Sequence, residues 1–264
     1  MNAKPRSVPP VRVGARIFIS RLRDKYCLKR AHQEGGRTRC RTWRSIWAVL
    51  TAAIILQPPI ALADDPPPLS PAQVALFDTP HLKNIAHPET LAYRLERTGP
   101  DPLVDTVLVH IQTIHPNGTK YVSFDFLTGP HRQFFPAVDD FSGNPLLMLF
   151  LEHDVLEMRE QTGIAAAYFR NHIRAAFIDR ADMAATTIPF AGKTVAARLI
   201  TLKPFRDDPR LANLPSFRDK TYRFVLSEDV PGQIETLAAE MPADAGSDTP
   251  AWSETIMFVG EKPE

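Results

Sequence analysis

Seven histidines follow residue 63, and histidine is the side chain most often used for metal binding and for proton transfer near neutral pH. They are His81, His87, His110, His115, His131, His153 and His172. Only His153 and Glu157 have a ligand-like spacing, one helical turn apart. Zinc takes three or four convergent ligands, and no H-E-x-x-H motif is present. We therefore expect a solvated helix face here and predict no metal site and no cofactor.

Paired acids and nucleophiles are the other residue types that could carry catalysis. Asp139 and Asp140 are adjacent, so in a strand they would point to opposite faces and could not clamp one substrate. There is no G-x-S-x-G motif and no cysteine after Cys40. We predict no catalytic residues and expect no enzyme activity.

One catalytic alternative stays open, a hydrolase whose histidine and carboxylate come from distant segments. Such a site depends on geometry that spacing does not reveal. It requires His110 or His153 to meet Asp125, Asp139 or Glu157 in a cleft.

Aromatic side chains recur at alternating positions of residues 120–127 and 221–227. Such rings form either an ordinary core under helices or one wall of an apolar pocket. Arg132 lies next to His131 and close to the Phe134-Phe135 pair, where it could anchor an acidic head group. The candidate ligand-binding residues are Phe124, Phe126, Arg132, Phe134, Tyr222 and Phe224.

The first 63 residues have the three marks of a secretory signal. Residues 1–47 carry 13 Lys or Arg against 2 acids, and the apolar run 46–56 contains no charged residue. Ala61-Leu62-Ala63 gives the small-x-small pattern that a signal peptidase accepts. An uncleaved anchor would need about 20 apolar residues, and a Pro pair at 58–59 would interrupt its helix. We predict a cleavable Sec-type leader and signal over residues 1–63 and a periplasmic product.

Removing the leader changes the charge of the chain. Of 31 basic and 30 acidic residues, 13 and 2 lie in the leader, which leaves 18 and 28 and a net charge of −10 for residues 64–264. An acidic chain disfavours nucleic-acid binding. Cys27 and Cys40 both lie in the leader, so no later cysteine can form a disulfide or accept a lipid. We expect a soluble product without a permanent membrane anchor.

The remaining 201 residues suit a single domain. We expect a flexible Pro-rich segment over 64–76 and one domain over 77–264. Alternating residues predict strands at 91–97, 106–114 and 120–127, with a further short strand at 132–135. Asn117-Gly118 between two alternating runs predicts a β-hairpin.

Two helices and a second group of strands should follow. Asn144 can cap a helix with its side chain and Pro145 suits the first helical position, so we expect a helix to about Arg159 and its end near Gly163. A second helix should cover 165–179. Strands are predicted at 194–203, 221–227 and 255–259, and 233–240 is either a strand or a short helix. This order predicts an α+β fold, a curved antiparallel sheet open like half a barrel, with a central helix pair packed on one face.

Two resemblances bear on the chain. The segments Gly143-Asn144-Pro145-Leu146-Leu147-Met148, Phe150-Leu151-Glu152 and Tyr168-Phe169-Arg170-Asn171 resemble an uncharacterised proteobacterial secreted family. The element order over 77–259 resembles the unclosed half-barrel of the periplasmic lipoprotein carrier and its outer-membrane receptor, the Lol system. That resemblance implies an apolar cavity for acyl chains between sheet and helices.

Three functions remain open on the sequence. The leading one is a non-enzymatic periplasmic protein that binds an apolar or amphipathic, lipid-like ligand between the sheet and the helix pair. The second is the periplasmic hydrolase with a histidine and carboxylate site. The third is an envelope interaction module whose exposed edge strand recruits a partner, because sheet edges can do so. The sequence does not identify a protein partner.

Overall fold

The structure of this chain is a computed structural model that describes residues 68–243 and 251–263. The predicted leader and signal peptide, residues 1–63, lie outside the described residues. Within the described ranges, no helix is long and apolar enough to cross a membrane.

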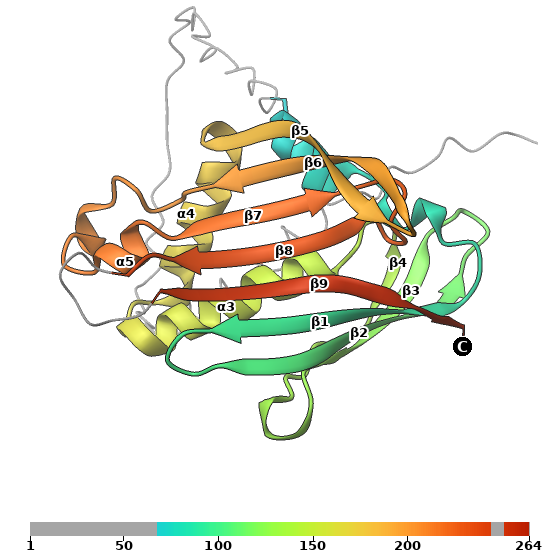
Figure 1. The fold of residues 1–264 in the computed structure, drawn as a ribbon, viewed down its shortest axis with the longest axis horizontal. Helices are drawn as coiled ribbons and strands as arrows, with labels where there is room; N and C mark the ends of the chain where they lie inside the picture. Colours follow the sequence, from blue (N-terminus) through green and yellow to red (C-terminus); the bar gives the residue numbers. More distant parts are fainter. Residues whose placement is uncertain (1–67, 244–250, 264) are drawn as a thin grey trace, which may run out of the picture. The chain divides into compact units, whose positions relative to one another are not determined.

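A nine-stranded antiparallel sheet forms the framework (Figure 1). Its strands are β1 (Glu89–Thr98), β2 (Leu103–Ile114), β3 (Lys120–Phe126), β4 (Val138–Phe141), β5 (Ala181–Phe190), β6 (Lys193–Leu202), β7 (Thr221–Leu226), β8 (Ile234–Met241) and β9 (Trp252–Pro263). Strands β1 to β4 form one meander and β5 to β9 form another. Because β9 pairs with β1, the spatial order is β4-β3-β2-β1-β9-β8-β7-β6-β5. The sheet is curved and open, with β4 and β5 at its edges, which confirms the predicted α+β half-barrel-like fold.

The two long helices lie on the same face of the sheet, behind it in Figure 1. They are α3 (Leu146–Thr162) and α4 (Ala166–Asp179). The N–H of Leu146 donates to Asn144 Oδ1 at 3.1 Å, so Asn144 satisfies one of the free donors at the start of α3. Gly163 ends α3 in the left-handed conformation, at φ 71°. Both helix boundaries follow the local signals in the sequence.

Short helical turns complete the fold. They are α2 (Pro71–Gln73), the π-helical turn η1 (Val74–Asp78), the 3-10 turns η2 (His81–Asn84), η3 (Gly129–His131) and η4 (Pro209–Leu211), and α5 (Pro215–Arg218). Ser70 caps α2 and its hydroxyl donates to the carbonyl of Phe177 in α4 at 2.7 Å. Ala72, Ala75 and Leu76 are buried. The predicted Pro-rich segment 64–76 is therefore helical and packed over its second half.

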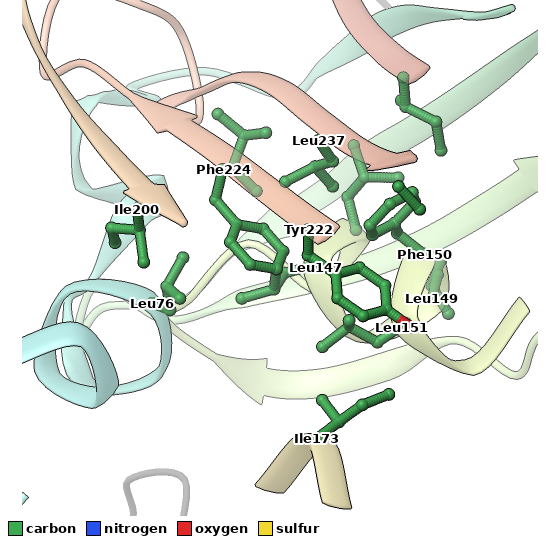
Figure 2. Close-up of a cluster of buried hydrophobic side chains, with 14 of the residues drawn as sticks. Leu76, Leu147, Leu149, Phe150, Leu151, Ile173, Ile200, Tyr222, Phe224 and Leu237 are labelled. Carbon is green, nitrogen blue, oxygen red and sulfur yellow. The ribbon is translucent and has the colours of Figure 1, made fainter. Parts of the chain in front are cut away.

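The core lies between the sheet and the two long helices. Alternate residues of the central strands point toward the helices, as in Leu91, Tyr93 and Leu95 of β1, which are all 0% exposed. Figure 2 shows the side chains of Tyr222 and Phe224 of β7 close to Leu147 and Phe150 of α3. Among the described residues, the largest fully buried side chains come from this sheet face, as Tyr93 and Tyr222 do, and from the helices, as Phe150 and Phe169 do.

Three segments differ from the sequence predictions or decide between them. Residues 132–135 form no strand, since only Gln133 makes a single bridge, to Phe126, and the fourth strand is β4. Prolines at 130 and 136 flank this stretch and cannot donate to a ladder. Strand β5 was not predicted, and residues 233–240 are a strand, β8, rather than a helix.

Candidate functional site

The six predicted ligand-binding residues divide into two groups. Four share the sheet face that carries the helices: Phe124, Phe126, Tyr222 and Phe224. Phe134 and Arg132 lie elsewhere, in the loop after η3. Phe134 is 91% exposed, and Arg132 donates to Asp125 Oδ1 at 2.6 Å on the protein surface. The role of all six in ligand binding stays a prediction.

Aromatic rings fill the space between the sheet and the helices. Phe150 of α3 contacts Tyr222 and Phe224 of β7, with ring centroids 6.4 and 6.5 Å apart. Phe126 of β3 packs edge-on against Phe135 at 5.2 Å. Phe126, Tyr222 and Phe224 are 0% exposed, so solvent does not reach these rings. In this conformation side chains occupy the space in which the sequence predicted a ligand.

Four charged side chains join α3 to the middle of the sheet, and we call them the Arg97 cluster: Arg97, His153, Glu157 and Glu254. Arg97 of β1 is the direct cross-strand neighbour of Glu254 of β9. Its Nε and Nη2 donate to Glu254 Oε2 at 2.8 and 2.6 Å, and Nη2 also donates to Glu157 Oε1. His153 Nε2 lies 3.2 Å from Glu254 Oε1 and 3.5 Å from Glu157 Oε1.

Burial and neighbouring charges set the protonation of the Arg97 cluster. Burial by itself lowers the pKa of His153, but the hydrogen bond and the negative charge of Glu254 outweigh burial and raise that pKa above 6.5. Burial by itself raises the pKa of Glu254, but the neighbouring His153 and Arg97 outweigh burial and lower that pKa below its usual value. Burial is also the main reason why the pKa of Glu157 is raised. A charged His153 therefore neutralises the buried group, with two cations facing two carboxylates.

The same residues have the composition of a metal site. Among the described residues, His153, Glu157 and Glu254 bring one ligand atom each to within 4.8 Å of one another. The guanidinium of Arg97 already contacts both carboxylates. A proton on His153 brings the buried group to zero net charge, whereas a divalent ion beside a neutral His153 would leave a net charge of about +1 in a buried site. The donor set therefore fits an ion cluster better than a metal centre.

A second buried polar group lies next to the first on α3. Asp154 Oδ1 accepts from Lys220 Nζ and Asp154 Oδ2 accepts from the hydroxyl of Tyr222 at 2.5 Å. Burial and the adjacent Asp154 raise the pKa of Tyr222. Lys220 Nζ also lies 4.5 Å from the ring centroid of Trp252, a cation–π distance. One predicted ligand residue, Tyr222, thus ties the helix pair to the sheet.

Two of the pairs that a hydrolase would require do form, but outside both clefts described for residues 68–243 and 251–263. His153 lies beside Glu157 inside the protein. His110 Nε2 lies 3.1 Å from Asp125 Oδ2 and its Nδ1 lies 2.8 Å from Thr90 Oγ1 on the opposite sheet face. His115 contacts Asp139 at 2.7 Å near the hairpin tip. None of these residues lines either of the two clefts described below.

An open cleft lies where strands β1, β7, β8 and β9 end or begin, and we call it the Trp252 cleft. Its volume is about 580 Å³. Met241, Pro242, Ala251 and Trp252 form its apolar part, and Lys203, Arg206, Asp219 and Glu240 line it with charge. Trp252 is half-buried, packs against the core and pairs with Met241 across strands β8 and β9. This cleft is not among the sites predicted from the sequence, although Trp252 is the only tryptophan after residue 63.

A neighbouring, smaller cleft shares two of these residues. Its volume is about 270 Å³, and Lys203 and Arg206 line it together with Arg180, Asp182, Thr201 and Asp207. Lys203 and Arg206 thus stand between the two clefts.

Fold and site define an α+β protein with an open, curved antiparallel sheet, a helix pair on one face and a cleft at the strand ends. No protein-family model matches the sequence, and no curated protein matches it. Among solved structures, the lipoprotein LppX from Mycobacterium tuberculosis is similar, with 7% sequence identity and a TM-score of 0.26 over 64% of this chain and 84% of LppX. A similarity of this degree carries no argument about function.

Proposed function

We propose that this chain is an exported, non-enzymatic protein that binds an apolar or amphipathic ligand, and that the Trp252 cleft receives it. The observation that carries the proposal is the cleft of about 580 Å³ with an apolar wall at the border of the core. Small-molecule sites commonly have about 300 to 1,000 Å³.

The position of Trp252 supports this proposal. Trp252 alternates in register with Glu254 and Ile256, so it belongs to the sheet face that packs on the helices. One side of its ring lies near Lys220, and the residue also lines the cleft. An apolar chain seated on Trp252, Met241 and Pro242 would therefore extend the core outward. A ligand that reached Tyr222 or Phe224 would first have to part α3 from the sheet.

A fluorescence titration tests the proposal. Trp43 and Trp47 are replaced by Phe in the full chain, so that Trp252 reports alone, and 1-dodecanol is added below its solubility limit. We expect a saturable blue shift of the emission. Thr221→Phe, which fills the cleft, should weaken binding about tenfold, because each 1.4 kcal/mol of lost contact is a factor of ten. Thr186→Phe, on exposed β5, is the matched control.

Two outcomes would contradict the proposal. One is the absence of saturable binding by a protein whose circular dichroism shows a folded chain. The other is equal affinity of Thr221→Phe and the unsubstituted protein.

A second candidate function rests on edge strand β5. This strand has ten residues, pairs only with β6 and carries a single charge, Asp182. The other edge, β4, has four residues including Asp139 and Asp140, which protects it from pairing. A long, nearly uncharged edge is a template for a strand of a partner protein.

The backbone register of β5 locates its open positions. The hairpin turn Ala191-Gly192 has φ 47° and 75°, and a two-residue turn of this kind closes on a hydrogen-bonded pair, Phe190 and Lys193. By alternation, Met183, Ala185 and Thr187 direct their backbone groups away from β6. Ala185→Pro should abolish recruitment of a partner strand with little loss of stability. If the Ala185→Pro variant still bound the partner protein, as measured by light scattering of the purified complex, β5 would not be the edge that recruits it.

A further inference from the structure

We propose that the Trp252 cleft selects ligands that carry an anionic group, a carboxylate or a phosphate ester, and that Lys203 and Arg206 hold this group. The inference rests on the proposed function, since it names the class of ligand for the same cleft.

The balance of charge in the cleft is the first argument. Two acids line it, and each has an arginine partner: Asp219 lies 3.2 Å from Arg218, and Glu240 lies 3.2 Å from Arg223. Lys203 and Arg206 make no ion pair within 4.0 Å with any acid of residues 68–243 and 251–261. The cleft therefore holds two cations whose charge no described side chain balances.

The neighbouring cleft does not remove this surplus. Its Asp207 lies 3.9 Å from Arg180, which leaves Asp182 as the only other acid there. Across that cleft, Arg180, Lys203 and Arg206 face two carboxylates. Lys203 and Arg206 line both clefts, and among the described lining residues they are the cations without an ion pair within 4.0 Å.

Local structure holds the two cations in position. Lys203 directly follows the last residue of β6, and Arg206 follows Phe205. Pro204 and Phe205 between them are buried, and the Phe205 ring packs edge-on against Phe169 of α4 at 5.7 Å. The backbone of both cations is thereby fixed to the core, while their side chains are exposed. This arrangement limits the entropy that ligand binding would have to offset.

The negative charge of the chain after its predicted leader favours one class of anion over another. Residues 64–264 carry a net charge of −10, so a small free anion is repelled at long range. An anion joined to an apolar chain gains contact with Trp252 as well. The cleft should therefore favour anionic amphipathic molecules over both inorganic phosphate and neutral molecules of the same chain length.

The Trp252 titration, in the full chain with Trp43→Phe and Trp47→Phe, tests this selectivity with four probes. They are laurate, dodecyl phosphate, 1-dodecanol and inorganic phosphate, each below its micelle or solubility limit. Laurate and dodecyl phosphate should bind about threefold to tenfold more tightly than dodecanol, because each exposed ion pair contributes less than the 1.4 kcal/mol that corresponds to a factor of ten, and two cations act together. Inorganic phosphate should bind most weakly.

Variants then assign the effect to residues. Lys203→Gln and Arg206→Gln should each weaken laurate binding about threefold and leave dodecanol binding unchanged. Lys193→Gln is the matched control, since Lys193 is an exposed lysine at the opposite end of the same strand.

The outcomes separate the two proposals. Equal affinity for laurate and dodecanol would overturn the anion selectivity and leave the proposed function standing. An equal loss in the Lys193→Gln variant would also overturn it. Failure of both probes to bind would overturn both proposals, and phosphate binding as tight as that of dodecyl phosphate would support the anion site and contradict an amphipathic ligand.

Discussion

Replacing Arg97 by methionine should destabilise the fold strongly, because Arg97 donates to both carboxylates of the buried cluster under α3. The side chains of Arg97, Glu157 and Glu254 are 14%, 20% and 1% exposed. Removing one partner of a buried ion pair costs about 3 to 5 kcal/mol. Because Arg97 and Glu157 are partly exposed and His153 remains, the expected loss of stability is about 3 kcal/mol. Methionine keeps most of the packing, so the loss reports charge.

Urea unfolding followed by circular dichroism measures this loss, and the same strand supplies the control. Arg94 of β1 points to the opposite face, is 49% exposed and lies 3.4 Å from Glu96. Arg94→Met should change stability by no more than about 0.5 kcal/mol, as exposed pairs contribute little. The double variant Arg97→Met with Glu254→Gln should recover at least half of the loss, because it removes the unpaired buried charge. An Arg97→Met loss below about 1 kcal/mol, or no recovery in the double variant, would refute the reasoning.

Two further predictions concern His153 and Gly232. The pKa of His153 is raised above 6.5, so its contribution to stability is complete below pH 6.5 and is lost as the pH rises through the folded-state pKa. The urea midpoint should therefore fall between about pH 6 and about pH 9, and His153→Gln should flatten this fall. An unchanged slope in the variant would contradict the prediction. Gly232 has φ 71°, and a Cβ there would lie 2.6 Å from Leu91 Cδ1 and 2.9 Å from Asn144 Nδ2, so Gly232→Ala should cost about 2 kcal/mol or more by urea unfolding. Gly192→Ala, at φ 75° with nothing within 4 Å, should cost about 1 kcal/mol, and equal losses would refute the steric argument.

Elements with strong local chemistry were predictable from the sequence. Asn117-Gly118 does join β2 to β3, with the N–H of His115 donating to the carbonyl of Thr119 at 2.9 Å. Asn144 and Gly163 bound α3 as their chemistry requires. In each case a few neighbouring residues determine the conformation.

Strand β5 could not be predicted in this way. Its sequence contains Ala181, Met183, Ala184 and Ala185, which favour helix, and Pro189, which is uncommon inside a strand. Pairing with β6 over ten residues overrides these preferences. Because β5 is an edge, Pro189 is tolerated on its open side.

The sequence marks one member of the Arg97 cluster but not its partners. Arg97 follows Leu91, Tyr93 and Leu95 on the inward face of β1, so strand alternation alone marks it as a charged residue among core positions. Its partner Glu254 lies 157 residues away and becomes a neighbour only because β9 returns to pair with β1. Likewise, the cleft combines Lys203, Asp219, Glu240 and Trp252 from distant segments, and spacing does not reveal that meeting.

Methyl NMR of the full chain labelled at its methionines tests the location of the ligand most directly. Met241 lines the Trp252 cleft, whereas Met158 of α3 is 1% exposed within the layer between sheet and helices. Saturating laurate should shift the Met241 methyl signal and leave Met158 unchanged. A shift of Met158 with Met241 unchanged would instead place the ligand between sheet and helices, and the absence of any shift would contradict ligand binding altogether.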